Sequence, residues 1–135
     1  MAGLQWLPHR HIDLRLNRLQ RVVVGEAGLL SHVAQLDVRD AGLEELDVRS
    51  LSRLELLRCD RNTLTLLRVS GLALKGLYTA HNELRALEVF PVPESLTVVD
   101  VSRNHLDCVP DWVCESTRLE VLDISHNNIK ELPIQ

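Results

Sequence analysis

Aromatic side chains are scarce in this chain of 135 residues, in which two Trp, one Tyr and one Phe make up 3% of the total. Hydrophobic residues account for 45%, so a core has to be built mainly from aliphatic side chains. An excess of positive charge is missing as well. The chain has 15 Lys and Arg against 19 Asp and Glu, a net charge of −4 and a pI of about 5.8, which argues against nucleic acid as a partner on electrostatic grounds.

Long apolar runs are also missing. The longest uninterrupted aliphatic runs, such as Val22–Val24, are far too short to cross a bilayer. Residues 1–11 lack the apolar segment of a secretory signal, and no N-x-[ST] glycosylation site occurs. We therefore expect a cytoplasmic protein, with the nucleus as a second location, and no membrane span.

Enzyme motifs are absent too. The sequence has no phosphate-cradling glycine loop, no G-x-S-x-G and no Asp-Gly dipeptide. One alternative is a metal site near His105, Cys108, Cys114 and His126, but no C-x-x-C or H-x-x-x-H spacing supports it. We expect no catalytic residues, no cofactor and no metal site within this chain.

The most informative feature that is present is Leu recurring at a regular interval. The pattern Leu-x-x-Leu-x-Leu-x-x-Asn-x-Leu fits residues 96–106 and 119–129, with other aliphatic residues at some Leu positions. This is the leucine-rich-repeat signature, whose period is about 20–29 residues. We predict a partial cap or N-terminal edge over residues 1–8 and repeats over 9–135, the last one truncated. The six units begin near residues 9, 33, 54, 74, 96 and 119.

Each landmark of the unit has a structural role. Apolar pairs that flank one residue, such as Val99 and Val101, alternate with period two and so predict a short strand with one buried face. Repeats that stack in this way contact only their neighbours. The sequence therefore predicts an α/β repeat fold: a leucine-rich-repeat solenoid with a parallel concave sheet of about six short strands and irregular or short helical convex segments.

The Asn position is expected to close the turn after each strand. Its amide both donates and accepts hydrogen bonds, so it can satisfy backbone groups that stacking buries. Ala41 occupies this position in the second unit, followed by Gly42, and we expect a loosened turn there. The predicted Asn ladder consists of Asn17, Asn62, Asn82, Asn104 and Asn127.

The cysteines indicate reduced thiols. Cys59 occupies a position where the repeat needs a buried aliphatic residue, and free Cys packs well as a small hydrophobic residue. A bridge between Cys108 and Cys114 is the alternative. The cysteine clusters that cap extracellular repeat proteins are not visible here, which favours a cytosolic or nuclear protein.

The concave face is the surface on which we expect function. Its polar residues alternate in sign across the units, so one interpretation is a solvated ladder that only keeps the face soluble. The other is a surface that binds a protein partner and is centred on Tyr78, since Arg and Tyr are frequent binding anchors. An acidic or phosphorylated segment would suit its Arg and His side chains. The predicted partner-binding residues are Arg58, Arg61, Tyr78, His81, Asp100, Arg103 and Asp123.

A carboxylate site on the same face is a further alternative. Asp100 and Asp123 should lie on adjacent strands, as should Asp13 and Asp37, and paired carboxylates can share a proton or hold a metal. An open face supplies no desolvating pocket, so shifts in pKa should be small. We therefore favour binding over catalysis.

The last predicted strand lies around residues 122–124, and no complete repeat follows it in this sequence. An uncovered layer of aliphatic side chains beside an open strand edge invites pairing. We expect a piece of a longer array or a truncated isoform; otherwise a partner, or self-association through this C-terminal edge, would cover the strand.

Six segments together form a distinctive pattern, and the stretch Val109-Pro110-x-Trp112-Val113-Cys114-Glu115-Ser116 is its most specific part. The other segments are Asp13–Asn17, Ala80–Leu84, Pro91–Pro93, Val99–Asn104 and Leu119–Ile124. In these segments the chain resembles one known family, the PH-domain and leucine-rich-repeat protein phosphatases, and the resemblance covers residues 9–133.

The resemblance implies more about a parent protein than about this chain. The family joins a PH domain, a repeat array and a metal-dependent serine/threonine phosphatase domain that acts on the kinases Akt and protein kinase C. Neither of the other domains fits within these residues, and no catalytic residue of the family has a counterpart here. Two functions remain: a non-catalytic interaction module whose partner is a kinase of the Akt or protein kinase C type, or the part of a phosphatase that positions substrate.

Overall fold

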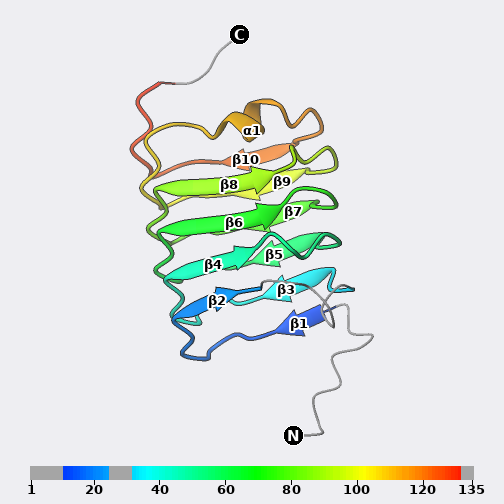
Figure 1. The fold of residues 1–135 in the computed structure, drawn as a ribbon. Coiled ribbons are helices and arrows are strands. Elements are labelled where there is room, and N and C mark those ends of the chain that lie inside the picture. Colours follow the sequence, from blue (N-terminus) through cyan, green and yellow to red (C-terminus); the bar gives the residue numbers. More distant parts are fainter. Residues whose placement is uncertain (1–10, 25–31, 132–135) are drawn as a thin grey trace, which may run out of the picture.

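The computed structural model describes residues 11–24 and 32–131. The chain winds into a stack of parallel strands that lie in two facing sheets (Figure 1). Helix is limited to one short segment within the described residues, and none of them forms a helix with the length and apolar character that a membrane crossing requires. The predicted solenoid of leucine-rich repeats is confirmed.

The first sheet has six strands in the order β1-β3-β5-β7-β9-β10, all parallel. The central residue of each strand is the second Leu of the repeat, and the register aligns these residues from Ile12 to Leu122. The strands are β1 (His11–Asp13), β3 (Gln35–Asp37), β5 (Leu56–Arg58), β7 (Gly76–Tyr78), β9 (Val98–Asp100) and β10 (Val121–Asp123).

The opposite side of the solenoid carries a second parallel sheet, which the sequence analysis did not include. Its order is β2-β4-β6-β8, with β2 (Arg21–Val23), β4 (Glu45–Val48), β6 (Leu66–Ser70) and β8 (Ala86–Phe90). The next unit places the short helix α1 (Asp111–Cys114) on this side instead of a fifth strand. The sheet therefore ends at β8.

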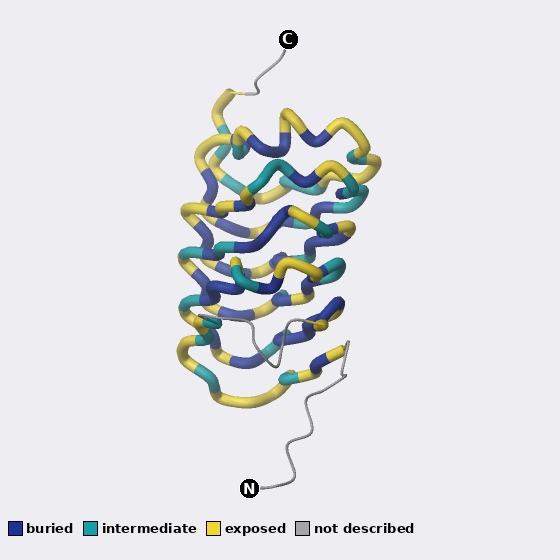
Figure 2. Tube along the Cα trace, turned by 45° about the vertical axis from the view of Figure 1, so that its right-hand side comes forward, coloured by how far each residue is buried: buried dark blue, intermediate teal, exposed yellow. Residues whose placement is uncertain are grey.

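The core lies between the two sheets. Leu57 and Leu77 of the first sheet and Leu67 of the second are fully buried, and they belong to one hydrophobic cluster that runs through the stack. Figure 2 shows buried segments at every level, with exposed ones at the turns. Burying a Leu side chain stabilises the fold by about 1.5–3 kcal/mol, so the stacked Leu residues are a large source of stability in a core whose aromatic member is Trp112.

The Asn side chains connect each turn to the preceding unit. The Asn104 amide donates to the carbonyls of Val101 in its own unit and Thr79 one unit earlier, and its Oδ1 accepts the N–H of Leu84. Asn82 and Asn127 repeat this arrangement. Each such side chain therefore joins two neighbouring units by hydrogen bonds.

The turn at Ala41 corrects one expectation, since it is not loosened. Ala41 is fully buried, and its N–H donates to Oδ1 of Asn62 at 2.9 Å. In four later units the peptide after the Asn position points its N–H at the preceding unit and donates to a carbonyl there. In this unit the same peptide points its carbonyl, that of Ala41, at the preceding unit, where it accepts the N–H of Leu19 at 2.8 Å. The peptide between residues 41 and 42 is thus turned over, and Gly42 adopts the φ of 70° that this orientation requires.

The two ends of the stack differ in what can be described. Val121 and Leu122 of β10 are 53% and 38% exposed, whereas the equivalent Val99 of β9 is fully buried. The expected cap over residues 1–8 lies outside the described residues, as do the last four positions of the final unit. The layer of β10 is therefore the exposed end of the described core.

Candidate interaction face

The outer face of the six-stranded sheet carries rows of side chains that cross the strands. One row, here called the strand-end row, is formed by the last residue of each strand, and the strand register places its members side by side. Neighbouring strands are about 4.8 Å apart, so each side chain can contact the next. The strand-end row consists of Asp13, Asp37, Arg58, Tyr78, Asp100 and Asp123.

A second row lies three residues further along each unit, and all of its members have left-handed backbone conformations, with φ between 52° and 63°. Non-glycine residues seldom adopt this conformation. Here the Asn ladder and bonds between units enforce it, because the N–H of His81 donates to the Ser102 carbonyl at 3.0 Å and the N–H of Arg103 to that of Ser125 at 2.9 Å. This left-handed row consists of Leu16, Asp40, Arg61, His81, Arg103 and His126.

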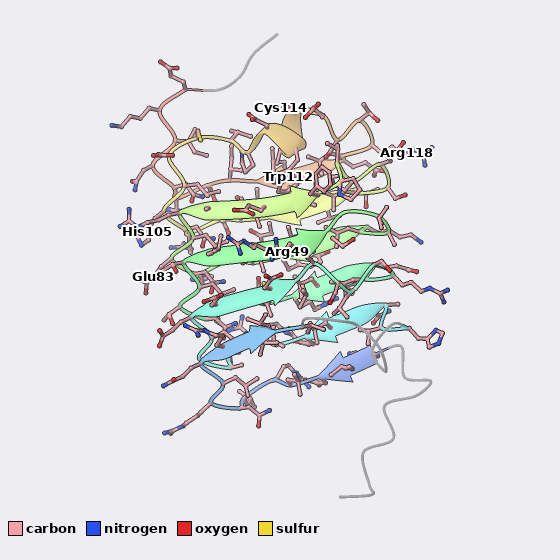
Figure 3. The ribbon with its side chains drawn as sticks, in the orientation of Figure 1. Arg49, Glu83, His105, Trp112, Cys114 and Arg118 are labelled. Atoms are coloured by element: carbon pink, nitrogen blue, oxygen red, sulfur yellow. The ribbon has the colours of Figure 1, made fainter. Side chains whose placement is uncertain are left out.

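A short motif, Asp-x-Arg or Asp-x-Ser, holds most of the strand-end carboxylates. Oδ1 of Asp37 accepts the backbone N–H of Arg39, and the guanidinium of Arg39 binds the same carboxylate at 2.6 and 2.9 Å. Asp47 and Arg49 repeat the motif on the second sheet, where Figure 3 labels Arg49. The sequence analysis missed this motif, although its recurrence along the chain was a usable signal.

The motif neutralises the part of the face formed by the first strands. The hydrogen bond from Arg15 lowers the pKa of Asp13. Burial opposes ionisation of Asp37, but the bonds from Arg39 outweigh it, so the pKa of Asp37 is lowered as well. A shallow groove of about 260 Å³ lies over these pairs and is also lined by Arg58.

Arg61, one of the residues predicted to bind a partner, is paired within the chain. Its guanidinium donates to both carboxylate oxygens of Asp40, the preceding member of the left-handed row, at 2.8–3.0 Å. The bond from Arg61 lowers the pKa of Asp40. Arg61 therefore offers less free charge to a partner than its place in the sequence indicated.

Arg58 is held differently, because its unit inverts the motif to Arg58-Cys59-Asp60. Its guanidinium carbon lies 5.3 Å from the centroid of the Tyr78 ring on the neighbouring strand, which is within the range of a cation–π contact. No ion pair involves Arg58 in the part of the chain that the structure describes. The pair of Arg58 and Tyr78 is thus a cation stacked on a half-buried aromatic ring at the middle of the face.

Asp60 does not serve as a counter-ion at the surface. Its Oδ1 accepts the N–H of Ala80 at 2.7 Å. Burial raises the pKa of Asp60, and the nearby Asp100 carboxylate adds to this effect. The Asp60 carboxylate therefore forms a hydrogen bond to the backbone of the next unit and does not pair with Arg58.

The last two strands carry the predicted residues Asp100 and Asp123, which are register partners. Each uses Oδ1 to accept the N–H and hydroxyl of a Ser two residues later, at 2.6–3.0 Å. The bond from the Ser125 hydroxyl is the main cause of the lowered pKa of Asp123. Among residues 11–24 and 32–131, no group of three or more His, Cys, Asp or Glu has the arrangement of a metal site.

His81 and Arg103 are consecutive members of the left-handed row, on the units of β7 and β9. Both are exposed, and neither forms an ion pair with another described residue. The structure therefore places Arg58, Tyr78, His81 and Arg103 on three consecutive units of one face, and this set is here called the Arg58–Arg103 cluster. The paired Asp13, Asp37 and Asp40 lie on the units before it, and Asp100 lies in the same unit as Arg103.

The thiols take no part in this face. All three cysteines are free, with Cys59 buried and Cys108 and Cys114 exposed. Burial raises the pKa of Cys59 to about 12, so this thiol stays protonated in the core. Cys108 and Cys114 lie on the side of the second sheet, in the segment that leads into and through α1.

Comparison with known proteins gives matches over the repeats. The family model described as Leucine Rich Repeat matches residues 118–135. PH domain leucine-rich repeat protein phosphatase 1 of Rattus norvegicus is 51% identical over 123 residues, 90% of this chain. The human PH domain leucine-rich repeat-containing protein phosphatase 1 is 50% identical over 122 residues, and a Protein phosphatase PHLPP-like protein of Drosophila melanogaster is 37% identical over 89.

The extent of these matches is uneven. The chain spans 7% of the length of the rat and human proteins and 9% of the fly protein. The fly match covers 64% of the chain, whereas the mammalian matches cover 90%.

Proposed function

We propose that this chain, a leucine-rich-repeat relative of the PH domain leucine-rich repeat protein phosphatases, is a non-catalytic protein-interaction module of intracellular kinase and phosphatase signalling. The resemblance predicted from the sequence is confirmed by 51% identity over 90% of the chain. In this proposal the partner binds the outer face of the six-stranded sheet.

The Arg58–Arg103 cluster is the observation that carries the proposal. Arg15, Arg39 and Arg61 are each held by a carboxylate within the chain, so they form the solvated ladder considered from the sequence. Arg58 instead stacks on Tyr78, and Arg and Tyr are the residue types most enriched among energetic anchors of interfaces. A cation held in place by a ring loses less side-chain freedom when a partner binds.

The partner proposed for this cluster is an acidic or phosphorylated protein segment. Guanidinium groups bind carboxylates and phosphates through paired, charge-assisted hydrogen bonds. Because the resembled family acts on kinases, a kinase of the Akt or protein kinase C type is the partner proposed by resemblance. Asp123 would repel an acidic segment that extended over β10, and so would favour binding nearer to Arg58 and Tyr78.

A second function is favoured by the relatives themselves, whose names describe protein phosphatases. In that case these repeats position a substrate for a serine/threonine phosphatase domain encoded further along the same gene. Sequencing the transcript beyond the codon for Gln135 separates the two. A stop codon there supports an independent module, and a continuing reading frame that reaches a catalytic domain supports the phosphatase.

Binding by the cluster is tested with a fluorescein-labelled phosphothreonine peptide rich in Glu, measured by fluorescence anisotropy. We expect Arg58→Glu to weaken binding by about tenfold or more, as is usual for a charge at the centre of an interface. Arg61→Glu should weaken it less, since Arg61 is already paired with Asp40. Arg21→Glu, an exposed change on the second sheet, is the matched control. Equal affinity for the Arg58→Glu and Arg21→Glu proteins would contradict the proposal.

A further inference from the structure

A groove of about 570 Å³ lies on the other side of the solenoid, between β8 and the segment that leads into α1. One wall is formed by Arg85–Phe90, and the other is formed by Leu106, Cys108–Trp112 and Glu115. Figure 1 shows α1 above β8, at the level where the second sheet would otherwise gain its next strand. The groove therefore follows the edge at which this sheet ends.

The backbone of β8 offers unused hydrogen-bonding groups to the groove. In the second sheet the N–H of Val24 donates to the Asp47 carbonyl of the next strand, and Val24 occupies the same position as Val89 in β8. By the alternation of a parallel ladder, the N–H and C=O of Leu87 and Val89 thus point away from β6, toward the groove. Within the described residues, the N–H of Val89 has no acceptor there.

One of these backbone groups, the Leu87 carbonyl, already has a hydrogen-bond partner in Trp112. The indole Nε1 of Trp112, which Figure 3 labels near α1 and β8, donates to the Leu87 carbonyl at 3.1 Å. In the units below, a strand covers this edge instead. Trp112 thus covers the beginning of this edge and leaves the backbone groups of Val89 without a neighbouring strand, whereas the Phe90 carbonyl accepts the N–H of Gly71 on the other side.

The side chains around the open end define the chemistry of an occupant. Phe90 is 82% exposed, the largest exposed fraction among the large hydrophobic residues of the described chain. Asp111 and Glu115 are exposed acids on the opposite wall, and neither has an ion pair within the described residues. Glu88 faces Arg68, with Nε and Oε1 3.3 Å apart. The groove thus combines the apolar surface of Phe90 with two exposed acids on the opposite wall, while Arg85 adds one positive charge on the β8 side.

We propose that this groove binds an extended segment of a partner protein in which basic and apolar side chains alternate, added as a short strand along the end of β8. Side chains of a strand alternate between two faces, so one set would contact Phe90 while the other lies near Asp111 and Glu115. The backbone of the segment would bond to Val89, as in other complexes formed by strand addition. A second copy of this chain fits poorly, because two identical negative walls would face each other.

This surface is separate from the Arg58–Arg103 cluster in place and in charge. The cluster lies on the outer face of the six-stranded sheet and presents Arg58 and Arg103, whereas the groove lies at the edge of the four-stranded sheet and presents the acids Asp111 and Glu115. The inference therefore does not rest on the proposed function.

The test uses a peptide of four Lys-Val repeats and the alkylation of cysteines, followed by mass spectrometry on the chain of residues 1–135. Cys108 lines the groove, Cys114 is exposed outside it, and Cys59 is buried. We expect saturating peptide to slow alkylation of Cys108 by about tenfold, as for any group that a ligand covers at high occupancy, with Cys114 unchanged. Equal rates at Cys108 with and without peptide would overturn the proposal.

Two further comparisons separate strand addition from general attraction between charges. The double change Asp111→Lys with Glu115→Lys should remove the protection, whereas Arg58→Glu should leave it intact. Two further peptides carry a methyl group on every second backbone nitrogen, one at the Lys residues and the other at the Val residues, so each blocks one edge of the strand. The peptide whose blocked edge faces β8 should not protect Cys108. Protection by all three peptides alike, or protection that survives the double change, would show that no strand is added there.

Discussion

Oδ1 of Asn62 accepts two hydrogen bonds from the preceding unit, from the N–H groups of Ala41 and Leu43, each at 2.9 Å. The amide nitrogen of the same side chain donates to the carbonyls of Val38 and Cys59. With a longer bond of 3.3 Å to the Asp60 carbonyl, one buried side chain thus contacts five backbone groups that belong to two units.

Replacing Asn62 with Ala should therefore be costly. Each buried backbone group left without a partner costs about 1–3 kcal/mol, less any relaxation, so we expect a loss of about 2–4 kcal/mol in the free energy of unfolding. Urea denaturation followed by circular dichroism measures it. Asn17→Ala is the control, because Asn17 is exposed and its side chain bonds, among the residues that the structure describes, only within its own turn. Similar losses for both variants would show that the link between units is not the source of stability.

Gly42 provides a second prediction about the same turn. Because its φ is 70°, Gly42→Ala should destabilise the chain by about 1 kcal/mol. A separate double variant, Ala41→Asn with Gly42→Thr, has the same two residues as the turn at Asn62 and Thr63. Because it allows the usual orientation of the peptide, we expect it to be more stable than Gly42→Ala. Thermal unfolding of the three proteins checks both steps. A pair less stable than Gly42→Ala would mean that the turned peptide is imposed by the surroundings.

Asp60 should make the chain less stable when it is ionised. Burial raises its pKa above the ordinary value, so its contribution favours the folded state below the ordinary value and is lost as the pH rises through the folded-state pKa. Asp60→Asn keeps an oxygen for the N–H of Ala80 and removes the buried charge. We expect the variant to be more stable than the parent at pH 7, with a smaller difference at pH 3, as measured by urea unfolding at both values.

Asp37 should show the opposite dependence. Its pKa is lowered overall, since bonds from Arg39 outweigh the effect of burial. Its contribution to stability is thus present above the ordinary pKa of 3.8 and lost as the pH falls through the folded-state value. Asp37→Asn should be destabilised at pH 7 and match the parent at pH 2. Asp13→Asn, with the same motif in an exposed position, should lose less. Equal losses would mean that burial of the pair is irrelevant.

The buried thiol allows unfolding to be followed directly. Because burial raises the pKa of Cys59 to about 12, and only the thiolate reacts, Cys59 should be alkylated only when the stack opens. Iodoacetamide labelling with mass spectrometry should show Cys108 and Cys114 modified first. The rate at Cys59 should rise with urea in step with the loss of circular dichroism. Rapid modification of Cys59 without denaturant would show that its layer opens locally.

The repeat pattern was sufficient to predict the six-stranded sheet, because burial of one residue in each strand sets the register. The second sheet was missed although Leu46-Asp47-Val48, Leu67-Arg68-Val69 and Leu87-Glu88-Val89 alternate as strands do. Those segments are short, and only their stacking on one another makes them a sheet. The pairing of Arg61 with Asp40 depends on contacts between units and on two left-handed residues, which a linear pattern does not display.

The repeat pattern also predicted part of the candidate face. The positions of Arg58, Tyr78 and Arg103 follow from the period, so their proximity could be expected. The neutralised arginines were not predicted. For Arg39 the sequence contains the signal, since Asp37 comes two residues before it, whereas Asp60 comes two residues after Arg58. For Arg61 it does not, because the partner Asp40 belongs to the preceding unit.

The left-handed row has a consequence for how any partner can align with this protein. Its side chains recur once per unit, at the strand spacing of about 4.8 Å, while a fully extended peptide advances about 3.3 Å per residue. Two steps of the row therefore match three residues of such a peptide to within about 0.5 Å. In an extended ligand that crosses the strands, every third residue would therefore lie beside every second member of the row. The solenoid would thus select ligands with a three-residue repeat, whichever side chains the row carries.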